Sequence, residues 1–138
     1  MKQTLIGLLL ALTAATHAAA ADSEAVFPPL LKPEAQEARA AHLAAAVLSR
    51  FHYKAIPLDD ALSSRTFDQY LKALDPEKVY FLQSDIDRLA ADRTLLDDAI
   101  LTEDLRVPFE IFNLYERRAA ERLAYARGLL HKLSLIHI

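Results

Sequence analysis

The chain has 138 residues, enough for one domain with a modest core and too few for two. It contains no cysteine and only two glycines, which excludes a disulfide framework, a thiolate metal site and a glycine-rich phosphate loop, and favours helices over strands. The formal net charge of −3 gives no general attraction to nucleic acid or anionic lipid.

The N-terminus has the pattern of a cleavable export signal. Lys2 supplies a positive charge, residues 5–12 form an apolar segment, and residues 18–21 are small, so we expect cleavage after Ala20 or Ala21. The apolar segment is about ten residues long, short of the roughly 20 needed to span a bilayer, which makes an uncleaved anchor the less favoured alternative. We expect the mature protein in the periplasm, with association at the inner membrane left open.

Prolines mark the beginning of the mature chain. Residues 22–32 carry Pro28 and Pro29, which disfavour helix, so we expect an extended lead-in there. Pro33 suits the first turn of a helix that runs to about His52. The apolar face of this helix is predicted to consist of Leu43, Val47 and Phe51.

A second helix is predicted to begin with Asp59 or Asp60 as its cap. It should end near Asp75, because Pro76 cannot continue a helix and restricts the residue before it. Its predicted apolar face consists of Leu62, Phe67, Tyr70, Leu71 and Leu74.

Two shorter helices are expected after this break. Residues 79–82 are too few for a helix and lack strand alternation, so they predict an extended connector with buried aromatic side chains. Ser84 is expected to cap the next helix, with Asp87 in the place of the capping-box carboxylate. Another short helix is predicted from Thr94 to Ile100.

The last helix is predicted to be the longest, from about Pro108 to Leu133. Its polar face carries Glu116, Arg117, Glu121, Arg127 and Lys132. Its apolar stripe is predicted to consist of Phe109, Phe112, Tyr115, Ala119, Leu123, Ala126, Leu130 and Leu133. The fold class is therefore all-α, an irregular bundle of four to five helices with a long C-terminal amphipathic helix. The helical domain covers residues 33–133, and residues 134–138 form a divergent tail.

The charged residues do not indicate a reactive site. Acid–base catalysis needs two carboxyl groups that converge on one substrate, whereas the acidic pairs here are predicted to cap helices or lie on solvated faces. These pairs are Asp59-Asp60, Asp85 with Asp87, Asp97-Asp98 and Glu103-Asp104. No histidine has the spacing of a zinc site, and His52 is predicted to contact a carbonyl group at a helix end. We therefore expect no cofactor and no metal.

A group of arginines in the last helix raises the question of nucleic-acid binding. These are Arg117, Arg118, Arg122 and Arg127, and glutamates alternate with them. A solvated, ion-paired helix face is the favoured interpretation.

Short motifs occur in order along residues 35–131. They include His52-Tyr53, Phe67-Asp68-Gln69-Tyr70-Leu71, Leu74-Asp75-Pro76, Tyr80-Phe81-Leu82 and Ser84-Asp85-Ile86. In this order and spacing they resemble the N-terminal helical domain of bacterial tail-specific proteases, also called carboxy-terminal processing proteases. The signature residues are His52, Tyr53, Asp59, Ser63, Phe67, Tyr70, Leu71, Leu74, Asp75, Pro76, Tyr80, Phe81, Leu82, Asp85, Tyr115, Arg117 and Arg118.

This resemblance implies a periplasmic serine endopeptidase that recognises apolar C-terminal ends of proteins. In such enzymes a desolvated lysine takes the proton of the nucleophilic serine, and backbone N–H groups stabilise the oxyanion. The family places its PDZ domain and its catalytic serine and lysine downstream of the matched region. No catalytic residue is therefore assigned here, and the chain by itself is expected to be inactive.

The implied role of the matched domain is structural and substrate-enclosing. Its implied partners are the rest of the protease chain and, through the full-length enzyme, protein substrates with apolar C-termini; an adaptor protein is not identified. Residues 134–138 leave the family pattern, so we expect a reading frame that continues in the parent enzyme. The alternative is a stand-alone periplasmic helical module with a binding or chaperone-like role.

Overall fold

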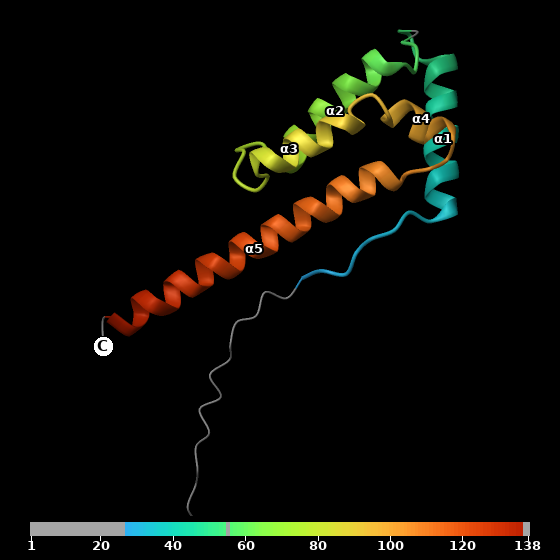
Figure 1. The fold of residues 1–138 in the computed structure, drawn as a ribbon. Coiled ribbons are helices and arrows are strands. Elements are labelled where there is room, and N and C mark those ends of the chain that lie inside the picture. The colour runs from blue at the N-terminus through green and yellow to red at the C-terminus, as the bar shows by residue number, and fades with distance from the viewer. Residues whose placement is uncertain (1–26, 55, 137–138) are drawn as a thin grey trace, which may run out of the picture.

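The computed structural model describes residues 27–54 and 56–136. The expected export signal, including Ala20 and Ala21, lies outside the described residues, as do residues 22–26 of the lead-in and 137–138 of the tail. The described residues form only helices and no strand, which confirms the all-α prediction (Figure 1). The elements are α1 (Ala35–Phe51), α2 (Asp60–Leu74), α3 (Gln83–Leu89), the 3-10 helix η1 (Ala90–Asp92), α4 (Leu96–Leu101) and α5 (Arg106–Ile136).

The short helix α4 joins the other elements, because it contacts α1, α2 and α5. The long helix α5 passes beneath α2 and α3 in the view of Figure 1 and continues beyond them towards the C-terminus. Since α4 and the connecting segments cover only the N-terminal part of α5, the two halves of this helix have different surroundings.

The core is small and lies where these helices meet. Phe67, Leu89, Leu96 and Ile111 are buried together, and Ile111 is completely excluded from solvent. Partly buried side chains pack around this cluster: Tyr70, Leu71, Leu74, Phe81, Val107 and Leu114. The predicted apolar face of α2 is thus confirmed at four of its five positions, from Phe67 onwards.

The helix ends follow local capping rules. Asp59 caps α2 as predicted, since its carboxylate accepts a hydrogen bond from the Leu62 N–H at 2.8 Å. The first helix begins at Ala35, two residues later than the predicted start at Pro33, because Glu34 serves as its N-cap. The Glu37 carboxylate accepts from the Glu34 N–H at 2.9 Å, which satisfies one of the free donors at the helix start.

Two other boundaries differ slightly from the prediction. The short helix expected over residues 94–100 is α4, which begins at Leu96 and ends at Leu101. Residues 90–92 form the separate 3-10 turn η1, which continues directly from α3. Leu95 is therefore the N-cap of α4 and lies outside its first turn.

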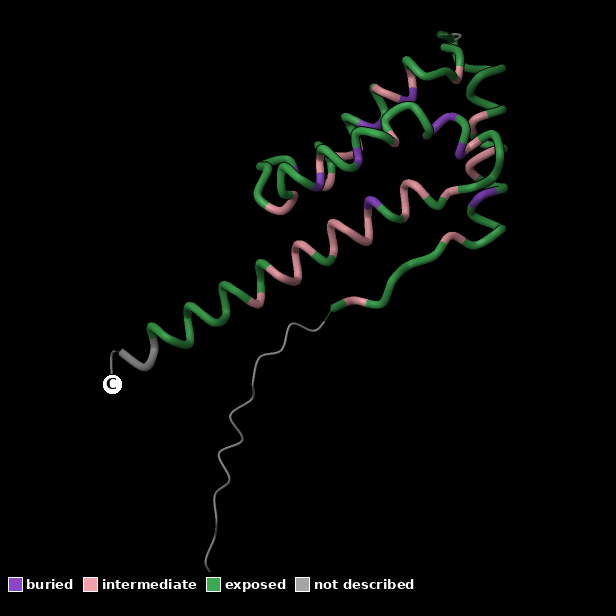
Figure 2. Tube along the Cα trace, in the orientation of Figure 1, coloured by how far each residue is buried: buried purple, intermediate pink, exposed green. Residues whose placement is uncertain are grey.

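The predicted stripe of α5 is correct only in its first half, where Phe109, Phe112, Tyr115 and Ala119 are half-buried. Ile111, the completely buried residue of this helix, is absent from the stripe, while Leu123, Leu130 and Leu133 are at least half exposed. Val107, Ile111 and Leu114 face the core instead, at the i, i+4, i+7 spacing of one helix face. The other helices reach only the first half of α5 (Figure 2). Only apolar side chains in that half can therefore be buried.

Helix α1 is also covered along only part of its length. Ala38 is its buried residue, and the His42 Nδ1 atom lies 3.2 Å from the carbonyl oxygen of Ile100 in α4. The predicted apolar face farther along the helix is exposed at Leu43, Val47 and Phe51. In the part of the chain that the structure describes, no helix combines the length and apolarity needed to cross a membrane.

The chain before α1 runs beside α5 without regular secondary structure (Figure 1). Asn113 of α5 holds this segment with two hydrogen bonds to the backbone of Leu31. The Leu31 N–H donates to Asn113 Oδ1 at 2.9 Å, and Asn113 Nδ2 donates to the Leu31 carbonyl at 2.8 Å. The amide side chain thus pairs with the extended backbone as a neighbouring strand would.

Candidate functional site

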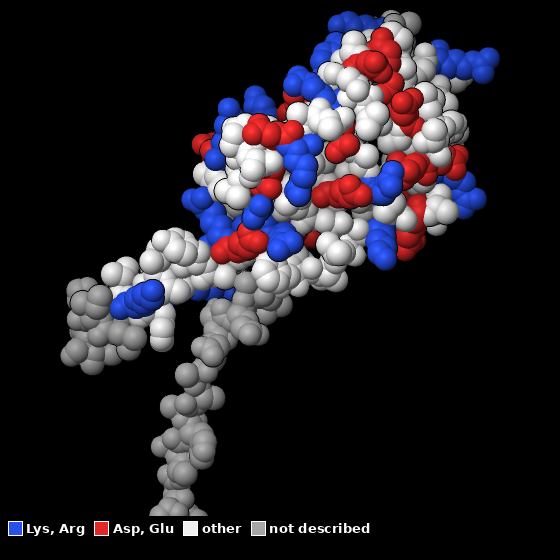
Figure 3. Space-filling view, in the orientation of Figure 1, with Lys and Arg blue, Asp and Glu red and all other residues white. Residues whose placement is uncertain are grey.

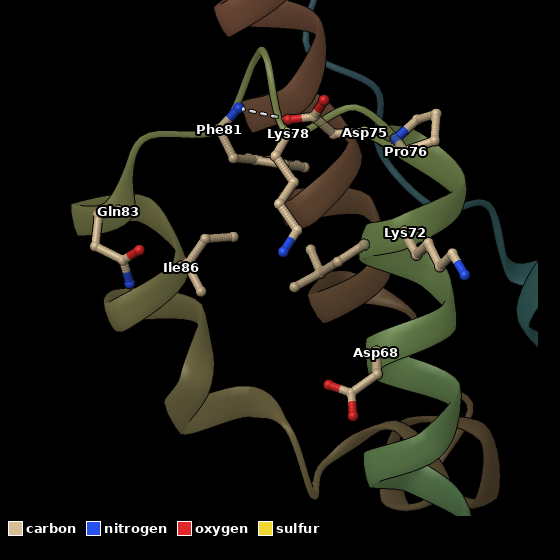
Figure 4. A pocket seen from close by; sticks show the side chains of 9 residues that line it. Asp68, Lys72, Asp75, Pro76, Lys78, Phe81, Gln83 and Ile86 are labelled. Atoms are coloured by element: carbon tan, nitrogen blue, oxygen red, sulfur yellow. Dashed lines mark hydrogen bonds between the residues drawn. The ribbon is translucent and has the colours of Figure 1, made fainter.

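The Asp75 side chain organises the connector between α2 and α3. It is almost fully buried, and its carboxylate accepts backbone N–H bonds from Val79 (2.8 Å), Tyr80 (2.8 Å) and Phe81 (3.0 Å). A single carboxylate therefore satisfies three donors that belong to no helix or strand, and the Phe81 bond is drawn in Figure 4. Burial alone would raise the pKa of Asp75, but these hydrogen bonds outweigh it and hold the pKa below its usual value.

Asp85 connects the start of α3 with the middle of α5. Its carboxylate accepts from the Leu82 N–H at 3.1 Å, which caps the helix, and forms a bidentate pair with Arg118. The Arg118 Nε–Asp85 Oδ2 distance is 2.7 Å and the Nη2–Oδ1 distance is 2.9 Å. The Asp85 side chain is only 4% exposed, so this ion pair is shielded from water on one side.

Arg118 also binds a second carboxylate. Arg118 Nη1 donates to Glu121 Oε2 at 2.7 Å, so the guanidinium bridges two carboxylates. The hydrogen bond from Arg118 lowers the pKa of Asp85 against the opposing effect of burial, and lowers the pKa of Glu121 in the same way. These three side chains are all ionised near neutral pH and are matched in geometry.

The prediction for this helix start is wrong in two respects. The N-cap of α3 is Leu82, and the reaching carboxylate is Asp85 at the third helical position, whereas Ser84 and Asp87 were expected in these roles. Asp85 lies at the helix start, as predicted, but it is also buried, because Arg118 approaches from α5. Since these residues are 33 positions apart, the local sequence could not reveal the contact.

Aromatic side chains complete the contact between connector and α5. The Tyr80 and Tyr115 rings meet edge to face with centroids 5.4 Å apart, and the Phe81 ring lies 6.1 Å from Tyr115. Arg122 Nη1 donates to the Val79 carbonyl at 2.6 Å, and its guanidinium lies over the Tyr80 ring. The connector was expected to bury its aromatic residues; Tyr80 and Phe81 are half-buried.

We call this assembly the connector junction. It consists of Asp75, Tyr80, Phe81, Asp85, Tyr115 and Arg118, together with Glu121 and Arg122. Six of these eight residues belong to the sequence signature. About a third of the signature residues therefore lie where the α2–α3 connector is fixed to α5.

Two other signature residues form structural hydrogen bonds away from the junction. The Ser63 hydroxyl donates to the Arg93 carbonyl at 3.1 Å and accepts from the Leu96 N–H at 2.9 Å, and the residue is buried. It thereby links α2 to the beginning of α4. The Tyr70 hydroxyl donates to the Pro108 carbonyl at 3.1 Å, and burial raises the pKa of this phenol.

The remaining signature residues do not cluster at one site. Phe67, Leu71 and Leu74 belong to the core, and Asp59 caps α2. His52 and Tyr53 are exposed at the end of α1, whereas Pro76 and Leu82 are exposed in the connector. The His52 Nδ1 atom lies 3.1 Å from the Lys54 carbonyl, which is past the helix, so the predicted contact with a helix-terminal carbonyl is wrong.

The arginine-rich face of α5 forms ion pairs as predicted. Arg117 pairs with Glu121 at 3.2 Å and lies over the Phe27 ring of the lead-in, 5.8 Å from its centroid. Positive and negative side chains also alternate on the face shown in Figure 3. Arg118 differs from its neighbours because its side chain is mostly buried in the junction.

One more acidic residue lies at a helix start, as predicted, but is buried. Asp97 in α4 is buried, and its Oδ1 atom has no hydrogen-bond partner among the described residues. The residues that the structure describes contain no group of three or more metal-ligating side chains. The connector junction holds the α2–α3 connector against α5, since its charged groups pair with one another or with backbone N–H and carbonyl groups.

Comparison with known proteins agrees with the sequence signature. Residues 44–135 match the family model described as the tail specific protease N-terminal domain. A tail-specific protease of Haemophilus influenzae is 43% identical over 86 residues, which amount to 62% of this chain and 12% of the relative. The chain thus corresponds to a small part of that protein. The resemblance inferred from the motifs is confirmed, and the chain belongs to the tail-specific protease N-terminal domain family.

Proposed function

We propose that this chain is the helical scaffold of a periplasmic tail-specific serine endopeptidase. The parent enzyme would cleave proteins recognised by apolar C-terminal ends, with a serine–lysine pair supplied by a part of the protein outside these residues. The observation that carries the scaffold role is the connector junction: six signature residues contribute to it, and its carboxylates form hydrogen bonds with Arg118 or with backbone N–H groups.

The exposed apolar faces support packing against the rest of the enzyme. Leu43 and Phe51 of α1 are 65% and 75% exposed, and Leu130 of α5 is 67% exposed. Leucine and phenylalanine side chains gathered on helix faces mark contact surfaces, because burying them is favourable. In the proposed enzyme these faces contact the remaining protease chain and help to enclose the substrate.

The proposal is tested by exchanging the matched segment in the Haemophilus influenzae relative for that of this chain. We expect the chimera to cleave a reporter protein with an apolar C-terminus, whereas deletion of the segment abolishes cleavage. A chimera with the same circular dichroism spectrum as the parent but no cleavage would contradict the scaffold role. The 138-residue chain alone is expected to leave the reporter intact.

Export is tested separately. Residues 1–32 are fused to a reporter enzyme that is active only outside the cytoplasm, and we expect activity that disappears when Leu8 and Leu9 are replaced by aspartate. Activity equal to that of a reporter without any leader would refute the periplasmic assignment. This result would leave the scaffold role unaffected.

The exposed apolar faces also favour a second candidate, a stand-alone periplasmic binding or chaperone-like module. Such a module should stay monomeric in solution and suppress the aggregation of an unfolded client protein. The scaffold of a larger enzyme should instead bind an apolar dye strongly and self-associate. Sedimentation of the purified chain with and without a client distinguishes the two candidates.

A further inference from the structure

Helix α5 carries a second apolar face, distinct from the face that enters the core. The core-facing residues are Val107, Ile111 and Leu114. The second face lies roughly a third of a turn away around the helix and is made by the last five members of the predicted stripe. We call it the heptad face, and its residues are Ala119, Leu123, Ala126, Leu130 and Leu133. Its three leucines are all at least half exposed, because the other helices do not reach them (Figure 2).

The spacing of the heptad face is that of a coiled coil. Its residues are separated alternately by four and three positions, and this strict seven-residue repeat keeps one narrow seam in contact with a partner helix. A helix that packs into a globular core carries a wider apolar stripe. Positions beside the seam include Arg122 and Arg127, which keep it narrow. The heptad face therefore fits one further helix.

A second copy of the chain supplies such a helix, and side-chain size sets its direction. In an antiparallel pair Leu123 lies against the partner's Ala126, and Leu130 lies against the partner's Ala119. Each layer then combines one large and one small side chain, which fills the space between the helices. A parallel pair would place alanine against alanine and leave gaps.

The arginines favour the same direction. In a parallel pair the positions beside the seam would bring Arg122 next to the partner's Arg127, and these like charges would repel each other. In the antiparallel pair Arg127 lies beside the partner's Ala120 instead. Arg122 donates to the Val79 carbonyl at 2.6 Å, which holds its guanidinium at the connector junction and away from the seam.

A pocket on the first half of α5 lies where the antiparallel partner helix would end. Its volume is about 260 Å³, and it lies between the lead-in and α5, next to Glu116. The partner's Leu133 comes opposite Glu116 in this register, so it can enter the pocket and pack against Phe27 and Leu30 of the lead-in. Asn113 holds the lead-in in place with its two hydrogen bonds, so the pocket exists before the partner arrives.

We propose that two copies of this chain pair through their heptad faces as an antiparallel dimer. Leu133 of each copy enters the lead-in pocket of the other. This interface is smaller than the roughly 1,200–2,000 Å² of stable complexes, so the dimer is weak, with a dissociation constant of about 100 µM. The dimer goes beyond the proposed function, since the apolar face of α1 and the outer side of α5 with Tyr125 remain available to the rest of the enzyme.

The first test is sedimentation equilibrium of the mature chain, which begins at residue 22 once the expected leader is removed. We expect a monomer at about 5 µM and a dimer as the largest species at about 500 µM. Leu130→Asp should weaken the dimer at least about tenfold, because it buries an unpaired charge in the seam. Leu43→Asp is the matched control on α1, where the leucine is similarly exposed, and should change the dissociation constant less than about twofold.

The second test reads the direction of the pair and does not depend on the aspartate variants. Because the chain contains no cysteine, thiols can be placed singly by Ala119→Cys and by Leu130→Cys. A short bifunctional thiol reagent should crosslink the two variants when they are mixed and leave each variant alone largely uncrosslinked. A mixture of Ala119→Cys with Leu43→Cys should also stay uncrosslinked.

Four results would overturn the proposal. They are a chain that stays monomeric at about 500 µM, an unchanged dissociation constant in Leu130→Asp, equal weakening by Leu43→Asp, and crosslinking of either cysteine variant alone as efficiently as the mixture. The chimera experiment does not depend on any of these results, so failure of the dimer leaves the scaffold role unaffected.

Discussion

The two halves of α5 carry similar mixtures of apolar and charged side chains but have different surroundings (Figure 2). In the first half Ile111 is completely buried, Leu114 packs against the core and Arg118 binds Asp85. In the second half Leu123 and Leu130 are exposed. The comparison shows that an amphipathic stripe contributes to a core only where another element covers it. Leucine side chains in the two halves of α5 should therefore contribute unequally to stability.

The largest expected effect follows from truncating the covered half. Ile111→Ala should lower the free energy of unfolding by about 3 kcal/mol, because it removes buried methyl groups and leaves a cavity. The matched change Leu130→Ala in the uncovered half should alter it by less than about 0.5 kcal/mol. Urea denaturation followed by far-ultraviolet circular dichroism measures both. Equal losses would mean that the two halves are covered alike.

The second effect concerns the junction that fixes the covered half. Arg118→Met should cost about 3 kcal/mol, because the Asp85 carboxylate then stays buried without its partner. Arg117, one position earlier, is 67% exposed, and Arg117→Met should cost less than about 1 kcal/mol.

A double variant separates loss of a partner from loss of the pair. Adding Asp85→Leu to Arg118→Met removes the unpaired charge, so we expect the double variant to be more stable than the sum of the single changes predicts. Strict additivity would show that the two side chains do not interact.

The third effect is a dependence of stability on pH. The pKa values of Asp75, Asp85 and Glu121 are lowered in the folded state by the hydrogen bonds described above. At pH values between the folded and the unfolded pKa of a carboxyl group, the unfolded chain binds more protons than the folded chain. The free energy of unfolding therefore decreases as the pH falls. The stabilisation should be complete above about pH 5 and be lost progressively at lower pH, because unfolded carboxyl groups begin to bind protons near that value.

A variant assigns this pH dependence to the junction. Asp85→Asn removes one of the three groups, so the free energy of unfolding should vary less steeply with pH in acid. The measurement is a series of urea titrations between neutral pH and the acid transition. A slope equal to that of the unmodified chain would exclude Asp85 as a contributor.

The sequence predicts those features that neighbouring residues determine. The Asp59 cap and the end of α2 before Pro76 are confirmed, because both depend on interactions within a few residues. The Asp85–Arg118 pair and the burial of Ile111 were missed, because each depends on segments brought together by the fold. The motif signature marked both Asp85 and Arg118, yet it could not indicate that they contact each other.

The smallest expected effect on stability is in the uncovered half of α5. Leu123→Ser together with Leu130→Ser should change the free energy of unfolding by less than about 1 kcal/mol in total, because both side chains are already exposed. The same double variant should bind an apolar dye less and self-associate less, since it removes exposed apolar surface. Leu114→Ser in the covered half should have the opposite signature, with a clear loss of stability and more dye binding from partial unfolding. Dye fluorescence and urea denaturation on the same samples distinguish the two. If the double variant unfolded as readily as Leu114→Ser, the second half of α5 would have to be covered by part of this chain itself, and the contact surface proposed for the rest of the protease would have to lie elsewhere.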